Sequence, residues 1–389
     1  MKVRIRPDAN KIVQEAVDAS IRVGGEIGVQ VAAYLNGEMV VDAWGGLADE
    51  TTGRKVDGDT LFPVFSVTKA VTATALHMQA ERGLIDYEKP IAHYWPEFAA
   101  QGKDKATVRD ALTHRTGLPM MPEGVTPELM CNWEWMVDRL ANMKPIFAPG
   151  TTSAYHSYTF GWIIGECVRR TDPQHRPFCW FIKDEICTPL GIDNLWMGIA
   201  DEVEPRIAKL TNIPAPAPGT PPPNQIRLGS LPPHVGVIQE VFGRPDVRRA
   251  CIPGAGAIMN ARSEARFFAM LANGGELDGV RLLSEASIRS FATPRANPGE
   301  VDAGQLRVLN LSIGAFHLGG ESPPAPPVIG RNPHTLSHPG AGGSIGWADA
   351  DAHLAVGICH NRMFDAPTPA ANPLQPIGDG VRKALGVAG

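Results

Sequence analysis

Two strand-rich segments at opposite ends of the chain constrain the fold more than any other feature. The first, "EIGVQVAAYLNGEMVVDAWGG" (26–46), holds two apolar runs joined by Asn36-Gly37, the strongest short signal for a β-hairpin. The second, "GSIGWADADAHLAVGICHN" (343–361), holds two strand-like runs around a polar turn. Helical patterns flank them at 11–21 and in the last 17 residues, "PLQPIGDGVRKALGVAG". This arrangement predicts one sheet shared by both chain ends, with helices packed on it.

The middle of the chain is predicted to be mostly helical. One helix is expected over 70–83, where Gly83 is suited to a C-terminal cap. Further helices are expected at 107–113, 128–142, 157–170, 177–186, 262–273 and 284–292. We therefore predict an α/β (α+β) protein. Its sheet domain would comprise residues 1–72 plus 296–389, and residues 73–295 would form an inserted, mostly helical domain, with the active site between the two.

Composition excludes several classes of function. The 389 residues are 43% hydrophobic and 20% charged, which argues against disorder, and a net charge of −5 does not suit a nucleic-acid or membrane-surface partner. The beginning of the chain, "MKVRIRPDANKIVQEAV", lacks the apolar core of a signal peptide, and no stretch approaches the roughly 20 apolar residues that span a bilayer. We expect a cytoplasmic protein; its oligomeric state is not predicted.

The six cysteines do not follow the spacing of a zinc site or a CxxC redox motif, so reduced thiols are expected. Cys179 and Cys187 are candidates for a close pair.

The run "LFPVFSVTKAVTA" (61–73) contains the first candidate for chemistry. Ser66 and Lys69 are three positions apart, which places both side chains on one face of a helix. Apolar surroundings lower the pKa of a lysine, and a neutral amine can accept the proton of a serine hydroxyl. The first turn of a helix also offers N–H groups to an oxyanion. The alternative is a serine cap beside a solvated lysine.

Two further segments bear on the same chemistry. In "TTSAYHSYTFGW", Tyr155 precedes a helical pattern and could carry a proton, although an aromatic residue that only packs at a helix start would look the same. In "SHPGAGGSIGW" (337–347), glycine-rich backbone runs into a strand, and such backbone lets a ligand approach closely.

Taken together, these motifs resemble the serine β-lactamase and penicillin-binding protein superfamily, in particular its class C-like branch of family VIII carboxylesterases and transesterases. The resemblance covers most of the chain. It rests on Ser66-Val67-Thr68-Lys69, "LTHRTGLP", "PGTTSAYHSYTFGWIIG", "PGAGAIMNARSEARFFAMLANGG" and "HPGAGGSIGW". It implies a β-lactamase-like fold with an antiparallel sheet flanked by helices.

The resemblance also implies roles for individual residues. Ser66 corresponds to the acylated nucleophile, Lys69 to its partner and Tyr155 to the proton shuttle. The N–H groups of Ser66 and Ala341 would form the oxyanion hole. The implied reaction is hydrolysis of a small-molecule ester without cofactor or metal; amide hydrolysis of the β-lactamase or D-aminopeptidase type and acyl transfer remain open.

Two departures from the superfamily pattern concern substrate binding. The asparagine of its Y-x-N motif is replaced by Ser157, and its K-T-G motif reads His338-Pro339-Gly340. Because a histidine supplies only a weak, pH-dependent charge, we expect inefficient β-lactam hydrolysis.

Other interpretations remain at this point. Gly342-Gly343-Ser344-Ile345-Gly346 satisfies G-x-S-x-G, the nucleophile elbow of α/β-hydrolases, but a strand rather than a helix is predicted after it. His334 and His338 could begin a metal site, yet no third ligand is evident. The chain could also be a non-catalytic ligand-binding protein on the same scaffold. Trp133, Trp135 and Trp162 are candidates to line a substrate pocket.

Overall fold

One seven-stranded antiparallel sheet joins the two ends of the chain. The computed structural model describes residues 2–211, 222–321, 327–364 and 372–387. The strand order is β3-β2-β1-β12-β11-β10-β9, and every neighbouring pair is antiparallel. These strands are β1 (Gly28–Leu35), β2 (Glu38–Asp49), β3 (Arg54–Lys55), β9 (His317–Leu318), β10 (Leu336–Pro339), β11 (Ile345–Asp349) and β12 (Leu354–His360). The shared sheet predicted from the sequence is confirmed.

The turn between β1 and β2 forms where the sequence predicts it. Asn36 and Gly37 have φ angles of 52° and 77°, the left-handed conformation that a tight hairpin turn requires and that asparagine and glycine tolerate. On its other side β1 pairs with β12 along its length, from Val29 opposite His360 to Leu35 opposite Leu354. Both central strands are buried along almost their whole length, since helices cover both faces of the sheet.

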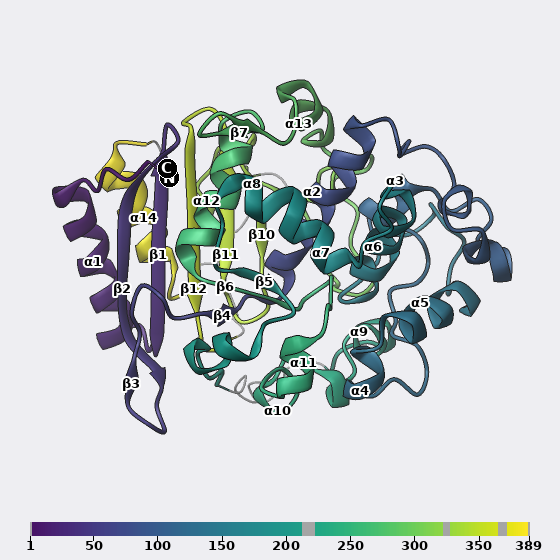
Figure 1. Ribbon diagram of the computed structural model, residues 1–389, viewed down its shortest axis with the longest axis horizontal. Coiled ribbons are helices and arrows are strands. Elements are labelled where there is room, and N and C mark those ends of the chain that lie inside the picture. The colour runs from purple at the N-terminus through teal and green to yellow at the C-terminus, as the bar shows by residue number, and fades with distance from the viewer. Residues whose placement is uncertain (1, 212–221, 322–326, 365–371, 388–389) are drawn as a thin grey trace.

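Three layers are visible in Figure 1. Helices α1 (Pro7–Arg22) and α14 (Gln375–Leu385) lie on the outer face of the sheet, and α12 (Ala261–Ala272) lies on the other. The outer layer closes a core of aliphatic side chains that includes Val13 and Val381. α12 packs on β12, β11 and β1 although it belongs to the range predicted to form the helical domain. The proposed division into two domains stays a prediction.

The remaining helices are, in chain order, η1 (Phe65–Val67), α2 (Thr68–Glu81), η2 (Ile91–His93), η3 (Pro96–Gly102), α3 (Val108–Leu112), α4 (Pro127–Met130), α5 (Trp133–Asn142), α6 (Thr159–Thr171), α7 (Phe178–Ile182), η4 (Lys183–Cys187), α8 (Thr188–Leu190), η5 (Asp201–Arg206), α9 (Gln225–Ser230), η6 (Pro233–Val235), α10 (Gln239–Phe242), α11 (Pro245–Arg249), α13 (Glu285–Phe291) and η7 (Pro327–Ile329). Two small sheets, β4 (Phe62–Pro63) with β6 (Ala257–Met259) and β5 (Leu195–Met197), and β7 (Glu276–Leu277) with β8 (Val280–Arg281), complete the fold. Among the described residues, no helix combines the length and apolar character that crossing a membrane requires.

Most predicted helices are present, with one clear difference. The single helix expected over 128–142 is two helices, because Asn132 interrupts it and caps α5 by accepting a hydrogen bond from the N–H of Trp135 at 3.0 Å. An N-cap has non-helical backbone, so the chain turns before the second helix starts.

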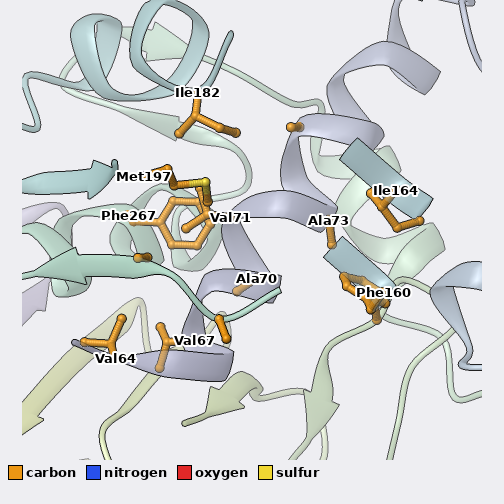
Figure 2. Close-up of a cluster of buried hydrophobic side chains, with 14 of the residues drawn as sticks. Val64, Val67, Ala70, Val71, Ala73, Phe160, Ile164, Ile182, Met197 and Phe267 are labelled. Carbon is orange, nitrogen blue, oxygen red and sulfur yellow. The ribbon is translucent and has the colours of Figure 1, made fainter. Parts of the chain in front are cut away.

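The central helix α2 is buried on all sides. Every residue from Thr68 to Gln79 is buried, so this helix has no polar face. Side chains from α6, α7, β5 and α12 surround it, as Figure 2 shows: Phe160, Ile164, Ile182, Met197 and Phe267. A lysine in its first turn is therefore withdrawn from solvent.

Candidate active site

Ser66 lies at the start of α2, in a turn that β6 holds in place. Phe65, just before it, has a φ of 47°, a left-handed conformation that costs a residue with a side chain about 1–3 kcal/mol. The hydroxyl of Thr68 donates to the Phe65 carbonyl and accepts a hydrogen bond from the N–H of Ala257 at 2.9 Å. These contacts stabilise the strained turn and direct the half-buried Ser66 side chain towards a cavity.

Lys69 makes three short polar contacts and is fully buried. Its Nζ lies 2.9 Å from Ser66 Oγ and 2.7 Å from each of the carbonyl oxygens of Ser157 and Gly254. Burial lowers its pKa well below the usual value, and within the described residues no carboxylate forms a salt bridge with it. Carbonyl oxygens only accept hydrogen bonds, so a neutral amine directs its two N–H groups to them and its lone pair to the Ser66 hydroxyl.

The Gly254 carbonyl reaches Lys69 because two glycines let a loop approach the start of α6. A Cβ on Gly254 would lie 2.4 Å from the carbonyl oxygen of Tyr158, and a Cβ on Gly161 would lie 2.1 Å from the Gly254 nitrogen. Both distances are far below van der Waals contact. Gly254 is not recognisable from the sequence as part of the site, because its contribution is a backbone carbonyl and residue type does not reveal backbone acceptors.

Tyr155 lies beside the same pair. Lys69 Nζ is 5.0 Å from the centre of its ring, and the half-buried Tyr155 lines the cavity with Ser66. Burial raises the pKa of Tyr155, while a hydrogen bond with Ser66 opposes the shift. The phenol is therefore protonated at neutral pH and able to give a proton to a leaving group.

Four buried histidines surround this pair, and the sequence analysis considered only one of them, His338, as a site residue. The ring of His114 lies 4.5 Å from that of Tyr155, and the ring of His317 lies 5.1 Å from that of His338. Burial lowers the pKa of His156 to about 4 and that of His317 to about 3, and it lowers the pKa values of the other two well below 6.5. All four are neutral at neutral pH, so they form an uncharged wall.

The residues of the third motif border the Ser66 cavity. A Cβ on Gly340 would lie 2.2 Å from the Val64 carbonyl oxygen, so only glycine lets the chain after β10 lie against the segment that leads to Ser66. Gly340 and Ala341 both line the cavity, as Ser66 does. The backbone of Ala341 is thus placed beside the nucleophile candidate, and its role in an oxyanion hole stays a prediction.

Of the two residues expected to contact substrate at the altered motifs, Ser157 borders the cavity and His338 is not in its described lining. Ser157 lines the cavity, and its hydroxyl lies 3.1 Å from that of Ser230. His338 is fully buried, its Nδ1 lies 3.1 Å from the Pro339 carbonyl oxygen, and it is not among the described residues that line the cavity. The pH-dependent charge expected of His338 does not arise near neutral pH, because burial keeps the ring uncharged.

The rival sites are not built in the structure. Ser344 is buried, its Oγ accepts a hydrogen bond from the His360 N–H at 3.2 Å, and strand β11 follows it where an elbow needs a helix. No group of three metal-ligating side chains is found in the described ranges.

The tryptophan candidates pack in or against the hydrophobic core, and Trp133, Trp135 and Trp162 are absent from the described lining of the cavity. The Trp133 indole donates instead to Glu166 at 2.9 Å.

The cavity itself has a volume of about 570 Å³. Aliphatic and aromatic side chains supply part of its wall, among them Leu231, Val237, Leu309 and Phe364. It is large enough for a small organic substrate with its reacting carbonyl at Ser66.

Comparison with known proteins agrees with this geometry. Residues 10–376 match the family model described as Beta-lactamase. The chain is 35% identical over 381 residues to the esterase/beta-lactamase LipL of Mycobacterium tuberculosis, covering 92% of this chain and 85% of that protein.

Solved structures show the same relationship. The crystal structure of a family VIII carboxylesterase superposes with a TM-score of 0.86 at 30% identity, covering 98% of both chains. A penicillin-binding protein homologue from Caulobacter crescentus superposes with a TM-score of 0.84 at 30% identity, covering 96% of this chain and 97% of the other. The chain thus belongs to the Beta-lactamase family, and it is a serine hydrolase with the β-lactamase-like fold.

Proposed function

We propose that the protein is a carboxylesterase that hydrolyses small-molecule esters through an acyl-enzyme on Ser66. The observation that carries the proposal is the environment of Lys69, whose amine contacts two carbonyl oxygens and the Ser66 hydroxyl. An amine held in this way has one function left for its lone pair, which is to accept the proton of Ser66.

The reaction proceeds in two steps. Ser66 Oγ attacks the ester carbonyl while its proton passes to Lys69, and the N–H groups of Ser66 and Ala341 stabilise the oxyanion. The bond to the alcohol oxygen then breaks, Tyr155 protonates that oxygen, and Lys69 returns its proton to Tyr155. Water, activated by the same groups, attacks the acyl carbon, and Ser66 leaves with its proton restored.

Esters are favoured over β-lactams and amides because the third motif lacks a cationic side chain. His338 stands where penicillin-recognising enzymes have a lysine that helps to hold the substrate carboxylate, and its buried ring is neutral. The similarity to a family VIII carboxylesterase supports the same choice, whereas LipL is named both an esterase and a β-lactamase. Slow lactam hydrolysis and transfer of the acyl group to another alcohol are alternatives on the same residues.

The test combines labelling with turnover. The purified protein is treated with a fluorophosphonate and mapped by peptide mass spectrometry, and its turnover of p-nitrophenyl butyrate is compared with that of a chromogenic cephalosporin. Ser66→Ala is expected to abolish both labelling and turnover. Tyr155→Phe is expected to lower kcat at least about a hundredfold, the range of a lost general acid.

Ser344→Ala serves as the matched control, since this serine belongs to the rejected elbow motif, is buried and is not among the described residues that line the cavity. Retained turnover in this variant with a label on the Ser66 peptide supports the proposal. A label on the Ser344 peptide, or unchanged kcat in Tyr155→Phe, contradicts it. Cephalosporin turnover faster than ester turnover would make the protein a β-lactamase instead.

A further inference from the structure

The cavity beside Ser66 carries positive charge. Two arginines, Arg227 of α9 and Arg307, are among its lining residues, whereas no aspartate or glutamate is found in the lining that the described residues provide. Burial lowers the pKa of Lys69, the basic group that contacts Ser66, and so disfavours its charged form. The two guanidinium groups are thus the charged side chains in the described lining of the cavity.

The two arginines come from segments that are joined to each other. Asn224 Nδ2, at the N-cap of α9, donates to the Ala303 carbonyl oxygen at 2.7 Å. Ile226 of α9 packs next to Ala303, against Gly304: a Cβ on Gly304 would lie 3.4 Å from Ile226 Cγ2. These contacts fix α9 against the segment that leads to Arg307, so both guanidinium groups are presented to one cavity.

The acidic residues closest in sequence to Arg307 have other partners. Asp302 is fully buried, and its carboxylate accepts hydrogen bonds from the N–H groups of Gly304 and Gln305 and from the Ser153 hydroxyl. Glu300 forms a salt bridge with Arg115. The side chain of Arg307 is exposed, and its guanidinium has no hydrogen-bond or salt-bridge partner within the described part of the chain, although the Arg307 carbonyl accepts a hydrogen bond from the Asp302 N–H. Its charge is available to a ligand.

We propose that this cavity selects esters that carry an anionic group, such as a carboxylate, which Arg227 and Arg307 bind while the ester carbonyl lies at Ser66. The planar fork of an arginine pairs with a carboxylate through two hydrogen bonds. The apolar part of the same substrate would contact Leu231, Val237 and Leu309. The inference rests on the proposed esterase function. The two arginines do not replace the lysine of the K-T-G motif, because that motif lies on β10, whereas Arg227 lies on α9 and Arg307 lies before β9.

Matched substrates test the inference, and they also distinguish a carboxylate on the acyl part from one on the alcohol part. For the acyl part, p-nitrophenyl hydrogen glutarate is compared with the p-nitrophenyl ester of glutaramic acid. For the alcohol part, 3-(butanoyloxy)benzoic acid is compared with 3-(butanoyloxy)benzamide. In at least one pair the acid is expected to have a kcat/KM about tenfold higher than the amide, the scale of a charge-assisted contact.

The arginine variants identify the source of the preference. Arg307→Gln and Arg227→Gln are each expected to reduce the ratio of acid to amide kcat/KM several-fold, and this ratio is the readout because each amide controls for any general change in turnover. Arg289→Gln is the control, because this exposed arginine of α13 pairs with Glu285 and does not line the cavity. Added salt is expected to weaken the preference. Equal kcat/KM values for acid and amide in both pairs, or a preference that survives both variants, overturn the inference.

A binding measurement separates this inference from the proposed function. Calorimetry with the Ser66→Ala protein gives the Kd values of 3-(butanoyloxy)benzoic acid and of its benzamide analogue without turnover, and the two glutaric acid derivatives are compared in the same way. Tighter binding of an acid, lost in Arg307→Gln, supports the anion site even if no ester is hydrolysed. Equal Kd values in both pairs overturn it, while p-nitrophenyl butyrate turnover still decides the esterase proposal.

Discussion

The buried carboxyl group of Glu264 is expected to make the stability of the protein fall as pH rises. The residue lies on α12 against the sheet and is fully buried. Its Oε2 accepts a hydrogen bond from Cys359 Sγ at 2.9 Å, and its Oε1 has no partner among the described residues. Burial raises its pKa from 4.5 to about 8, although the Cys359 contact opposes the shift. The folded protein therefore holds a neutral carboxylic acid at pH 7.

The magnitude follows from the two pKa values. Between pH 4.5 and about 8 the folded state keeps a proton that the unfolded chain has lost. The free energy of unfolding then falls as pH rises, by about 1.4 kcal/mol per pH unit. The contribution is complete below pH 4.5, is lost progressively up to pH 8 and is constant above; the full loss is about 5 kcal/mol. Burial raises the pKa of Cys359 well above 9, so this thiol does not titrate in the window.

The assay is urea unfolding followed by tryptophan fluorescence, for the wild type and Glu264→Gln, between about pH 5.5 and 7.5. Any fixed cost of the amide shifts the variant equally at every pH, and other titrating groups cancel in the difference. The wild type is expected to lose about 2–3 kcal/mol relative to the variant across this range. Parallel curves for the two proteins would refute the reasoning, because they would mean that Glu264 is ionised in the folded state.

Two further predictions concern the backbone of the active site and the cysteines. Gly254→Ala places a Cβ 2.4 Å from the Tyr158 carbonyl oxygen, so kcat/KM for p-nitrophenyl butyrate is expected to fall at least about tenfold, whereas Gly299→Ala, with no atom within 4 Å of the new Cβ, leaves it unchanged. Equal kcat/KM values for Gly254→Ala and Gly299→Ala would mean that the close approach of the Gly254 loop is not needed for catalysis. A hydrogen bond with Cys251 lowers the pKa of Cys179 to about 7, so iodoacetamide at pH 7.5 is expected to alkylate Cys179 first, and several-fold more slowly in Cys251→Ala. Preferential alkylation of another cysteine would contradict this.

The same contact bears on an expectation from the sequence. Cys179 and Cys187 were candidates for a close pair, and the neighbour that perturbs Cys179 is instead Cys251. Both belong to the inserted helical region but are more than 70 positions apart. Spacing along a chain predicts contacts within one helix, whereas this contact depends on how α7 packs against the loop after α11.

The predictable part of the fold follows from local rules. The Asn36-Gly37 turn, the alternation of strands around it and the helical periodicities each depend on residues a few positions apart. The helix over 128–142 was predicted as one element because its apolar periodicity continues through Asn132, while the competing cap hydrogen bond is a weaker signal. Charge and composition argue against nucleic-acid and membrane-surface partners without any tertiary information, and this expectation stays a prediction.

The candidate site also has a part that local sequence rules predict and a part that depends on tertiary packing. Ser66 and Lys69 can be paired from the sequence because they lie one helical turn apart, and their contact of 2.9 Å is a local consequence of that turn. Tyr155 was a candidate proton carrier by residue type, but only the resemblance paired it with Ser66 and Lys69, since nothing in its own segment shows that it packs against Lys69. The neutral His338 was expected to be titratable, because residue type predicts an ordinary pKa and only burial reveals the shift.

By itself the sequence determined which chemistry is available: a serine one turn before a lysine in an apolar run, in a chain whose two ends share one sheet. The tertiary structure alone decided which groups surround Ser66 and Lys69. It brought the Gly254 carbonyl to Lys69 across 185 positions and presented Arg227 and Arg307 to one cavity. The physical reason is range: hydrogen bonding and periodicity along a segment are local, whereas desolvation and the electrostatic field at a site are sums over every element that packs around it.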